Sequence, residues 1–205
     1  MSSSLVGSEM CIRDRDYTAQ RLMERGDEQV SASGITPSGE FHIGHLREIL
    51  SAEMIHRACL DAGMSSKYIF IVDSMDPLRR VYDFLSPEYE EFIGCPLAYI
   101  PAPDEDGSPG NGSVTYADHF LSPFLDSLEQ IGVRPEVVMN HETYERGLFA
   151  EYIDSAITNR EEIRRIIQQI SGRELPHDWF PYNPMGSGGS ICLLYTSDAA
   201  DDDVR

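Results

Sequence analysis

The segment Ser33–Glu48, with the sequence SGITPSGEFHIGHLRE, decides the fold because it joins a strand to a helix. Its first residues complete the short segment Val30–Gly34, which predicts a buried strand. Pro37 and Gly39 then predict a turn, since proline restricts φ and glycine can adopt a positive φ. From about His42 the pattern becomes helical and extends to Ala62, with one apolar stripe made of Leu46, Ile49, Leu50, Met54 and Ala58.

Two histidines lie in the first turn of this predicted helix. His42 and His45 are three residues apart, so both rings lie on one face and can donate to the same phosphate group. The free backbone N–H groups and the helix dipole favour an anion at this end. Gly44 lacks a side chain that would keep a planar base or ribose away from the backbone. Because the helix follows the carboxyl end of a strand, the pattern predicts a site that holds ATP for attack by a carboxylate.

A simpler alternative is a polar loop that caps an ordinary helix and exposes two surface histidines. The tetrapeptide of residues 42–45 alone would favour that alternative, because such a short motif is not specific. The preceding run from Gly34 to Gly39, in its strand–turn–helix context, favours the nucleotide site instead.

The tetrapeptide His-Ile-Gly-His at positions 42–45 resembles the first signature motif of the class I aminoacyl-tRNA synthetases. The run Gly34–Gly39 narrows the resemblance to the class I lysyl-tRNA synthetases. The resemblance covers roughly residues 16–185 and continues through Leu46–Glu48, Asp73–Val81, Tyr116–Phe120, Leu175–Pro176 and Trp179–Pro181. It implies a lysine–tRNA ligase that activates lysine with ATP, accompanied by Mg²⁺, and esterifies it to tRNA(Lys) in translation.

The same resemblance implies a role for individual residues. His42 and His45 match the catalytic histidines of the family. The ATP-binding positions of the family match Pro37, Ser38, Gly39, His42, Gly44 and His45. Gly34 and Thr36 match positions that line the amino-acid pocket.

An acidic residue follows the next predicted strand. The continuous apolar run Tyr68–Val72 predicts a parallel strand buried on both faces, and Asp73 and Asp76 follow it. Acids at this end face the same crevice as the histidines, although either could instead cap the next turn. The resemblance favours Asp73 as an amino-acid-binding residue, because an acid suits a substrate with a side-chain ammonium. Ser74 stands where an acid is common in the family.

Strands and helices alternate along the chain. This alternation predicts an α/β fold with an open, mostly parallel sheet, which agrees with the Rossmann-like catalytic core implied by the resemblance. The isoleucine stripe in the last predicted helix indicates a face in the core. The expected strands are 30–34, 68–73 and 135–140, and the other expected helices are Asp16–Gln29, Thr115–Ile131, Glu142–Asn159 and Glu161–Ser171, with an irregular surface segment from Ser86 to Gly112.

Both ends of the chain differ from its centre. Residues 1–15 and 186–205 are predicted to be non-native or disordered, since parts of them resemble translated adaptor DNA. Residues 16–185 are then the N-terminal part of a nucleotide-binding catalytic domain. No Lys-Met-Ser-Lys-Ser-like run is present, and Lys67 is the only lysine, so the sequence predicts a truncated domain with half an active site.

The net charge is −19, which is unusual for a protein that binds nucleic acid by itself. Without the six acidic and three basic residues of the end segments, the central part still carries −16. Contacts with tRNA are therefore assigned to a C-terminal region outside this chain. Two other hypotheses remain open: another nucleotidyltransferase, such as a glutamate or arginine class I synthetase or an adenylyltransferase, and a binding fragment without enzymatic activity.

Neither a metal site nor a membrane segment is predicted. Some members of the resembling family bind a structural zinc, and Asp104 and His119 could match two of its ligands, but two ligands do not close a zinc site. His119 is expected to be partly buried and hydrogen-bonded on its helix. Four cysteines without paired spacing, together with the absence of a signal sequence, predict a cytoplasmic protein. Cys59 is expected to fill space on the apolar side of its helix rather than act as a nucleophile, and Cys95, in a loop before Pro96, is not expected to be catalytic.

Overall fold

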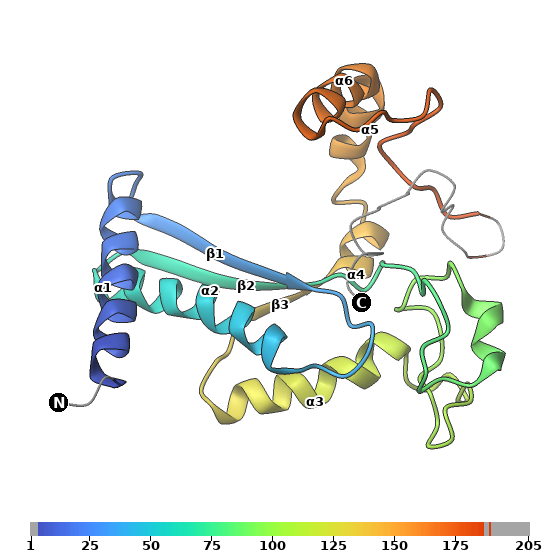
Figure 1. Cartoon of the computed structure of the whole chain (residues 1–205), viewed down its shortest axis with the longest axis horizontal. Helices are drawn as coiled ribbons and strands as arrows, with labels where there is room; N and C mark the ends of the chain where they lie inside the picture. The colour runs from blue at the N-terminus through green and yellow to red at the C-terminus, as the bar shows by residue number, and fades with distance from the viewer. Residues whose placement is uncertain (1–3, 187–188, 190–205) are drawn as a thin grey trace. The chain divides into compact units, whose positions relative to one another are not determined.

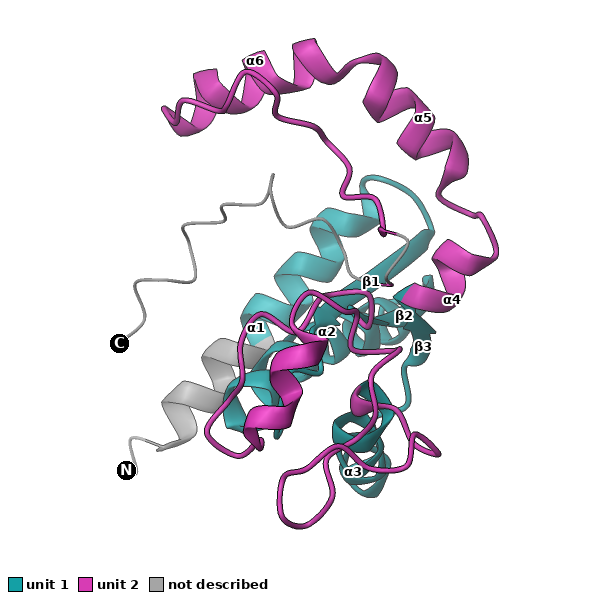
Figure 2. Ribbon diagram, turned by 90° about the vertical axis from the view of Figure 1, so that its right-hand side faces the viewer, with its two compact units in different colours: residues 1–73, 117–140 teal, residues 74–116, 141–205 magenta. Residues whose placement is uncertain are grey.

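The computed structural model describes residues 4–186 and 189, with side chains from residue 13 onward (Figure 1). It divides into two compact units (Figure 2). Unit 1 consists of residues 1–73 and 117–140, and unit 2 consists of residues 74–116 and 141–205. The tail predicted to be non-native or disordered lies almost wholly outside the described residues.

Unit 1 is built on a parallel sheet of three strands in the order β1-β2-β3. Strands β1 (Glu28–Ile35) and β2 (Ser65–Val72) pair along their whole length, and β3 (Glu136–Met139) pairs with the second half of β2. The helices of this unit are α1 (Ser4–Met23), α2 (Ile43–Asp61) and α3 (Tyr116–Gln130). The predicted α/β class with a parallel sheet is confirmed.

The main core lies between the sheet and helices α2 and α3, which cover the same face of the sheet (Figure 1). Burial in β2 alternates: Tyr68, Phe70 and Val72 are buried, whereas Ile69 and Ile71 are half-buried. The prediction that Tyr68–Val72 is buried on both faces was therefore wrong. The prediction of a buried strand at Val30–Gly34 was also wrong, since Val30 is 63% exposed and Gly34 is exposed as well. Within the described part of unit 1, helices cover only one face, so side chains that point the other way keep solvent contact. The core consists of Ile35, Ile49, Tyr68, Phe70, Val72, Leu121, Phe124, Leu128 and Val133.

The face of helix α2 that packs against the core differs from the predicted face. Ile49 and Ala58 are buried as expected, but Leu50 and Met54 are 40% and 37% exposed. Glu53 is buried instead, and its carboxylate accepts a hydrogen bond of 2.6 Å from Arg57 Nε. This ion pair offsets part of the cost of burying an acid, so the apolar stripe alone does not locate the buried face.

Helix α1 packs against α2 through a second cluster that contains Ala19, Ala58, Cys59 and Met64. It is longer at its start than the predicted helix 16–29, since it begins at Ser4, and it ends at Met23 before Gly26 takes a φ of 141°. Leu22 packs on the cluster, while Met23 is 42% exposed in the last turn.

Unit 2 contains a 3₁₀ helix, η1 (Pro87–Phe92), and helices α4 (Asn140–Glu145), α5 (Ala150–Thr158) and α6 (Arg160–Ser171). The single helix predicted for residues 142–159 is divided between α4 and α5, where Gly147 takes a φ of 67°. The isoleucine stripe of α6 is not a core face here, since Ile166 is 40% and Ile170 is 81% exposed. Ile163 and Ile167 of the same stripe are only half-buried.

The segment from Ser86 to Gly112, which was predicted to be an irregular surface segment, contributes buried residues to unit 2. Tyr89 in η1 is fully buried, and its hydroxyl donates to the carbonyl of Pro101 over 2.8 Å. Leu78, Leu97 and Ile100 are buried in the same unit. Across the described residues, helices are all too short or too polar to cross a membrane.

Candidate functional site

The candidate site lies in unit 1, in the chain between the end of β1 at Ile35 and the start of α2. Pro37 is fully buried, and the N–H of Ser38 donates to the carbonyl of Thr36 over 2.9 Å, which closes a tight turn. Gly39 does not take the positive φ expected for it. The turn therefore depends on Pro37 and on the short hydrogen bond, rather than on a left-handed glycine.

His42 and His45 cap the N-terminus of α2 reciprocally. His42 is the N-cap residue, with extended backbone, and its Nδ1 accepts a hydrogen bond of 3.0 Å from the N–H of Gly44. In return, Nδ1 of His45 accepts a hydrogen bond of 3.0 Å from the N–H of His42. The two rings lie 4.0 Å apart between centroids. Each histidine thus does in this helix what serine or glutamate does in a capping box.

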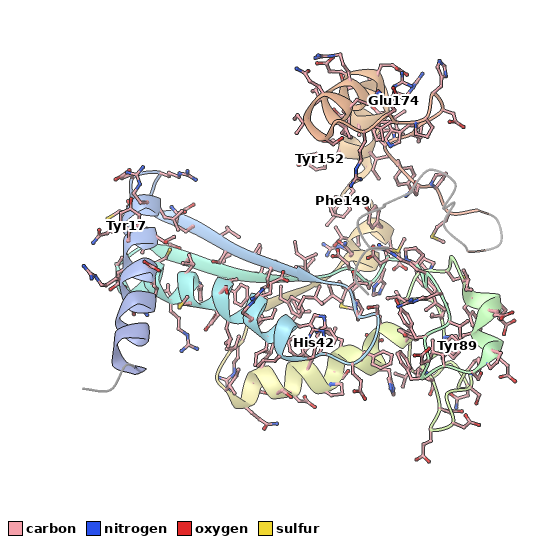
Figure 3. The ribbon with its side chains drawn as sticks, in the orientation of Figure 1. Tyr17, His42, Tyr89, Phe149, Tyr152 and Glu174 are labelled. Carbon is pink, nitrogen blue, oxygen red and sulfur yellow. The ribbon has the colours of Figure 1, made fainter. Side chains whose placement is uncertain are left out.

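This capping determines the tautomer of both rings. A backbone N–H can only donate, so Nδ1 of each ring must be unprotonated to accept it. The proton of each neutral ring is then on Nε2, the nitrogen not used in capping. Two Nε2–H donors are therefore available at a helix N-terminus, where the dipole favours an anion. Figure 3 marks His42 at this position.

His45 is the more enclosed of the two histidines. Burial lowers its pKa, and the neighbouring His42 lowers it further, against a smaller effect of Glu48 in the opposite direction. Phe41 contributes to this environment: its ring lies 5.1 Å from that of His45 and stacks on Phe124 of α3 at 4.3 Å. Phe41 thus connects the turn to the core, and the pKa shift favours the neutral ring that the capping requires.

The structure gives a reason for glycine at position 44 that the sequence did not reveal. A Cβ atom at this position would lie 2.7 Å from Cε1 and 2.9 Å from Nδ1 of His42. The space above Gly44 is therefore occupied by the His42 ring in its capping position. The approach of a base or ribose to this backbone, expected from the sequence, would require the ring to move.

Three residues meet at the carboxyl end of the sheet. Asp73 follows β2, and its N–H donates to the carbonyl of Ile35 over 3.0 Å. Its Oδ1 accepts a hydrogen bond of 2.7 Å from Nδ2 of Asn140, which follows β3. A Cβ atom added to Gly34 would lie 3.8 Å from Oδ2 of Asp73, so no side chain of β1 separates them. The structure thus brings together Gly34 and Asp73, both predicted to bind the amino acid.

Two residues near the predicted site were not identified from the sequence. Asn140 was assigned only to a strand, although a polar residue directly after a short apolar strand is itself a signal for this edge. Glu48 accepts a hydrogen bond of 3.3 Å from the N–H of Gly34 through its Oε1 atom. Its position one turn after His45, on the same helix, is the signal that could have identified it.

A groove of about 490 Å³ runs between the outer edge of β1 and helix α2. Of the predicted site residues, only Gly44 lines this groove. The other lining residues are Ser31, Ala32, Ser33, Arg47, Glu48, Ser51, Ala52 and Ile55.

The remaining predictions concern metal ligands and cysteines. In the described parts of the chain, no group of three or more His, Cys, Asp or Glu side chains could hold a metal ion. His119 is exposed, contrary to the expectation of a partly buried residue, and its ring lies edge-on to Phe120. Burial raises the pKa of the Cys59 and Cys95 thiols, which disfavours the nucleophilic thiolate.

Comparison with known proteins places these features in a family. The family model described as "tRNA synthetases class I (K)" matches residues 15–197. The lysine–tRNA ligase of Archaeoglobus fulgidus is 43% identical over 170 residues, which cover 83% of this chain and 33% of that protein. The lysine–tRNA ligase of Picrophilus torridus is 42% identical over 160 residues, covering 78% of this chain and 30% of the relative.

A third relative is lysine–tRNA ligase 1 of Methanosarcina acetivorans, which is 40% identical over 169 residues that cover 82% of this chain and 31% of that protein. This chain thus spans about a third of the length of the curated relatives it matches. The family match extends over most of the sequence and includes the capped histidine pair and the strand-end cluster. The chain belongs to the class I (K) family of tRNA synthetases.

Proposed function

We propose that this chain is part of a lysine–tRNA ligase, which activates lysine with ATP and transfers it to tRNA(Lys). The observation that carries the proposal is the reciprocal capping of α2 by His42 and His45. It leaves two Nε2–H donors at the positive end of a helix, after the short turn that follows the parallel strand β1. The names of the relatives, all lysine–tRNA ligases, support the choice of substrate.

In this proposal ATP binds, as its Mg²⁺ complex, over the start of α2. An oxygen of the lysine carboxylate attacks the α-phosphorus, and pyrophosphate leaves as the adenylate forms. The Nε2–H groups of His42 and His45 stabilise the charge that develops on the phosphate oxygens. The turn before them positions the nucleotide through Pro37, Ser38 and Gly39. Gly44, in the first turn of α2, also belongs to this nucleotide-binding set.

The amino acid binds at the carboxyl end of the sheet. The carboxylate of Asp73 receives the side-chain ammonium of lysine, because opposite charges attract most strongly where water is partly excluded. Gly34 leaves the strand end open to the substrate, and the hydroxyl of Thr36 contacts its polar groups. Asp73 is half-buried at this edge, which suits a group that must exchange water for an ammonium.

Transfer RNA binds through other parts of the full-length protein. The net charge of −19 on this chain does not favour the phosphate backbone, so the positive surface is expected elsewhere. A translation enzyme of this kind acts in the cytoplasm.

The test is exchange between ATP and pyrophosphate by a full-length enzyme that carries this chain, with tRNA(Lys) present. We expect exchange that depends on lysine. Exchange that depends instead on glutamate or arginine would overturn the assignment of the substrate. Exchange that no amino acid stimulates would overturn the assignment to a synthetase and favour another nucleotidyltransferase.

A further inference from the structure

We propose that Asn140 is a positioning residue that orients the carboxylate of Asp73 for the side-chain ammonium of the substrate. This inference rests on the proposed function, in which Asp73 binds that ammonium. It adds the residue directly after β3 to a site that the sequence motifs confine to the ends of β1 and β2 and the start of α2.

The register of the sheet brings the two side chains together. Val72 and Met139 are paired residues, and they are the last residues of β2 and β3. Asp73 and Asn140 therefore leave neighbouring parallel strands at the same level. Nδ2 of Asn140 donates to Oδ1 of Asp73 over 2.7 Å, a short distance typical of a hydrogen bond to an ionised acceptor.

The carboxylate is held so that its two oxygens have different neighbours. Oδ1 is directed to Asn140 on the β3 side, and Oδ2 lies toward Gly34 on the β1 side. The backbone of Asp73 is fixed as well, because its N–H donates to the carbonyl of Ile35 in β1. Rotation about the last side-chain bond would exchange the oxygens, and the bond from Asn140 opposes this rotation.

The amide is chemically suited to this task. A neutral donor orients the carboxylate without cancelling its charge, whereas lysine or arginine at the same place would compete with the substrate ammonium. Gly34 contributes by having no side chain on the Oδ2 side. The three residues thus combine an anion, a neutral donor that orients it and a neighbouring strand position without a side chain.

The simpler role for Asn140 is structural, because it is also the first residue of α4 and joins that helix to β3. The two roles differ in what they predict for substrates. A positioning role affects only ligands with a side-chain ammonium. A structural role affects all ligands of the site, or the folded fraction alone.

The experiment uses a full-length enzyme that carries this chain, with lysine-dependent exchange measured in the presence of tRNA(Lys). N140L keeps the approximate size of the side chain and removes the donor. We expect the KM for lysine to rise on the order of tenfold, with little change in the KM for ATP. The inhibition constant of norleucine, which has the same chain length without the terminal ammonium, should not change.

A double-mutant cycle tests whether Asn140 acts through Asp73. D73N alone should raise the KM for lysine, and adding N140L to D73N should raise it little further, because the oriented charge is already lost. N140S, with a shorter donor, should lie between the wild type and N140L. N159L is the matched control, since Asn159 donates its amide to the carbonyl of Ser155 on the exposed side of α5.

The outcomes separate the two proposals. An active wild type with an unchanged lysine KM in N140L overturns the role of Asn140 and leaves the proposed function standing. Equal weakening of lysine and norleucine, or additive effects of D73N and N140L, also overturns it. A wild type without lysine-dependent exchange contradicts the proposed function itself. Partial unfolding lowers kcat but does not change the comparison of lysine with norleucine.

Discussion

Nδ1 of His45 accepts a hydrogen bond of 3.0 Å from the backbone N–H of His42, while Nδ1 of His42 accepts one from Gly44. The signature histidines therefore have two functions at once. One nitrogen of each ring caps the helix, and the other is left as a donor. In the proposed function, stability and chemistry are coupled at this position, and suitable variants can separate them.

Variants of His45 separate capping from catalysis in the full-length enzyme. H45A removes both the acceptor and the outer donor, whereas the side-chain oxygen of H45N can still accept from the N–H of His42. We expect both variants to slow adenylation, by on the order of 2.7–4 kcal/mol in the barrier, with a smaller effect on ATP binding. Only H45A should also lower the midpoint temperature of thermal unfolding. Equal losses in rate and in ground-state affinity would exclude a transition-state role.

Acid should inactivate the site through His45. Burial lowers its pKa below the ordinary 6.5, so the folded protein binds this proton less readily than the unfolded chain does. The stabilising effect is present above pH 6.5 and is lost as the pH falls through the lower folded pKa. Protonation at Nδ1 also breaks the bond from the N–H of His42. The rate of adenylation should therefore decrease as the pH falls through this range, and this decrease should be absent in H45N. If the decrease persists in H45N, another titrating group causes it.

A methyl group at position 44 should displace a ring rather than unfold the protein. In G44A the new Cβ would lie 2.7 Å from Cε1 of His42, and the ring can turn away because it is exposed. Loss of the cap costs about 0.5–2 kcal/mol, which the better helix propensity of alanine, by up to about 1 kcal/mol, partly offsets. Activity should fall to the level of H42A, with a thermal midpoint close to that of the wild type. Activity above that of H42A would show that the ring keeps its place.

Recognition of lysine should depend on the hydroxyl of Thr36. T36V keeps the shape of the side chain and leaves its hydrogen-bond partner unsatisfied, at a cost of about 1–3 kcal/mol. The KM for lysine should rise while that for ATP stays nearly constant in exchange assays. An unchanged KM for lysine would leave Thr36 as a turn residue only.

The fold of unit 1 should depend strongly on Phe124. This residue is 9% exposed, belongs to the main core and stacks on Phe41 at 4.3 Å. F124A should lower the free energy of unfolding by about 3–5 kcal/mol, measured by denaturant titration of the 205-residue chain. S127A, one turn further along α3 and exposed, is the control and should change it by less than about 0.5 kcal/mol. Similar losses in both variants would contradict the packing described for α3.

The amino-acid sequence by itself determined the local structure around the site. The strand, the turn at Pro37 and the helix after His42 follow from short-range signals, namely apolar periodicity, a restricted φ and a change of period. These signals act over a few residues, so they need no knowledge of the rest of the chain. The alternation of such units was also enough to predict a parallel α/β sheet.

Only the tertiary structure decided which faces are buried and which side chains meet. Ile71 of β2 and Leu50 of α2 fit apolar patterns, yet both keep solvent contact because burial depends on what covers a face. Asp73 and Asn140 are 67 residues apart and meet because β2 and β3 pair in register. Such contacts depend on strand order and register, and these are set by the packing of the whole sheet rather than by the residues near each strand end.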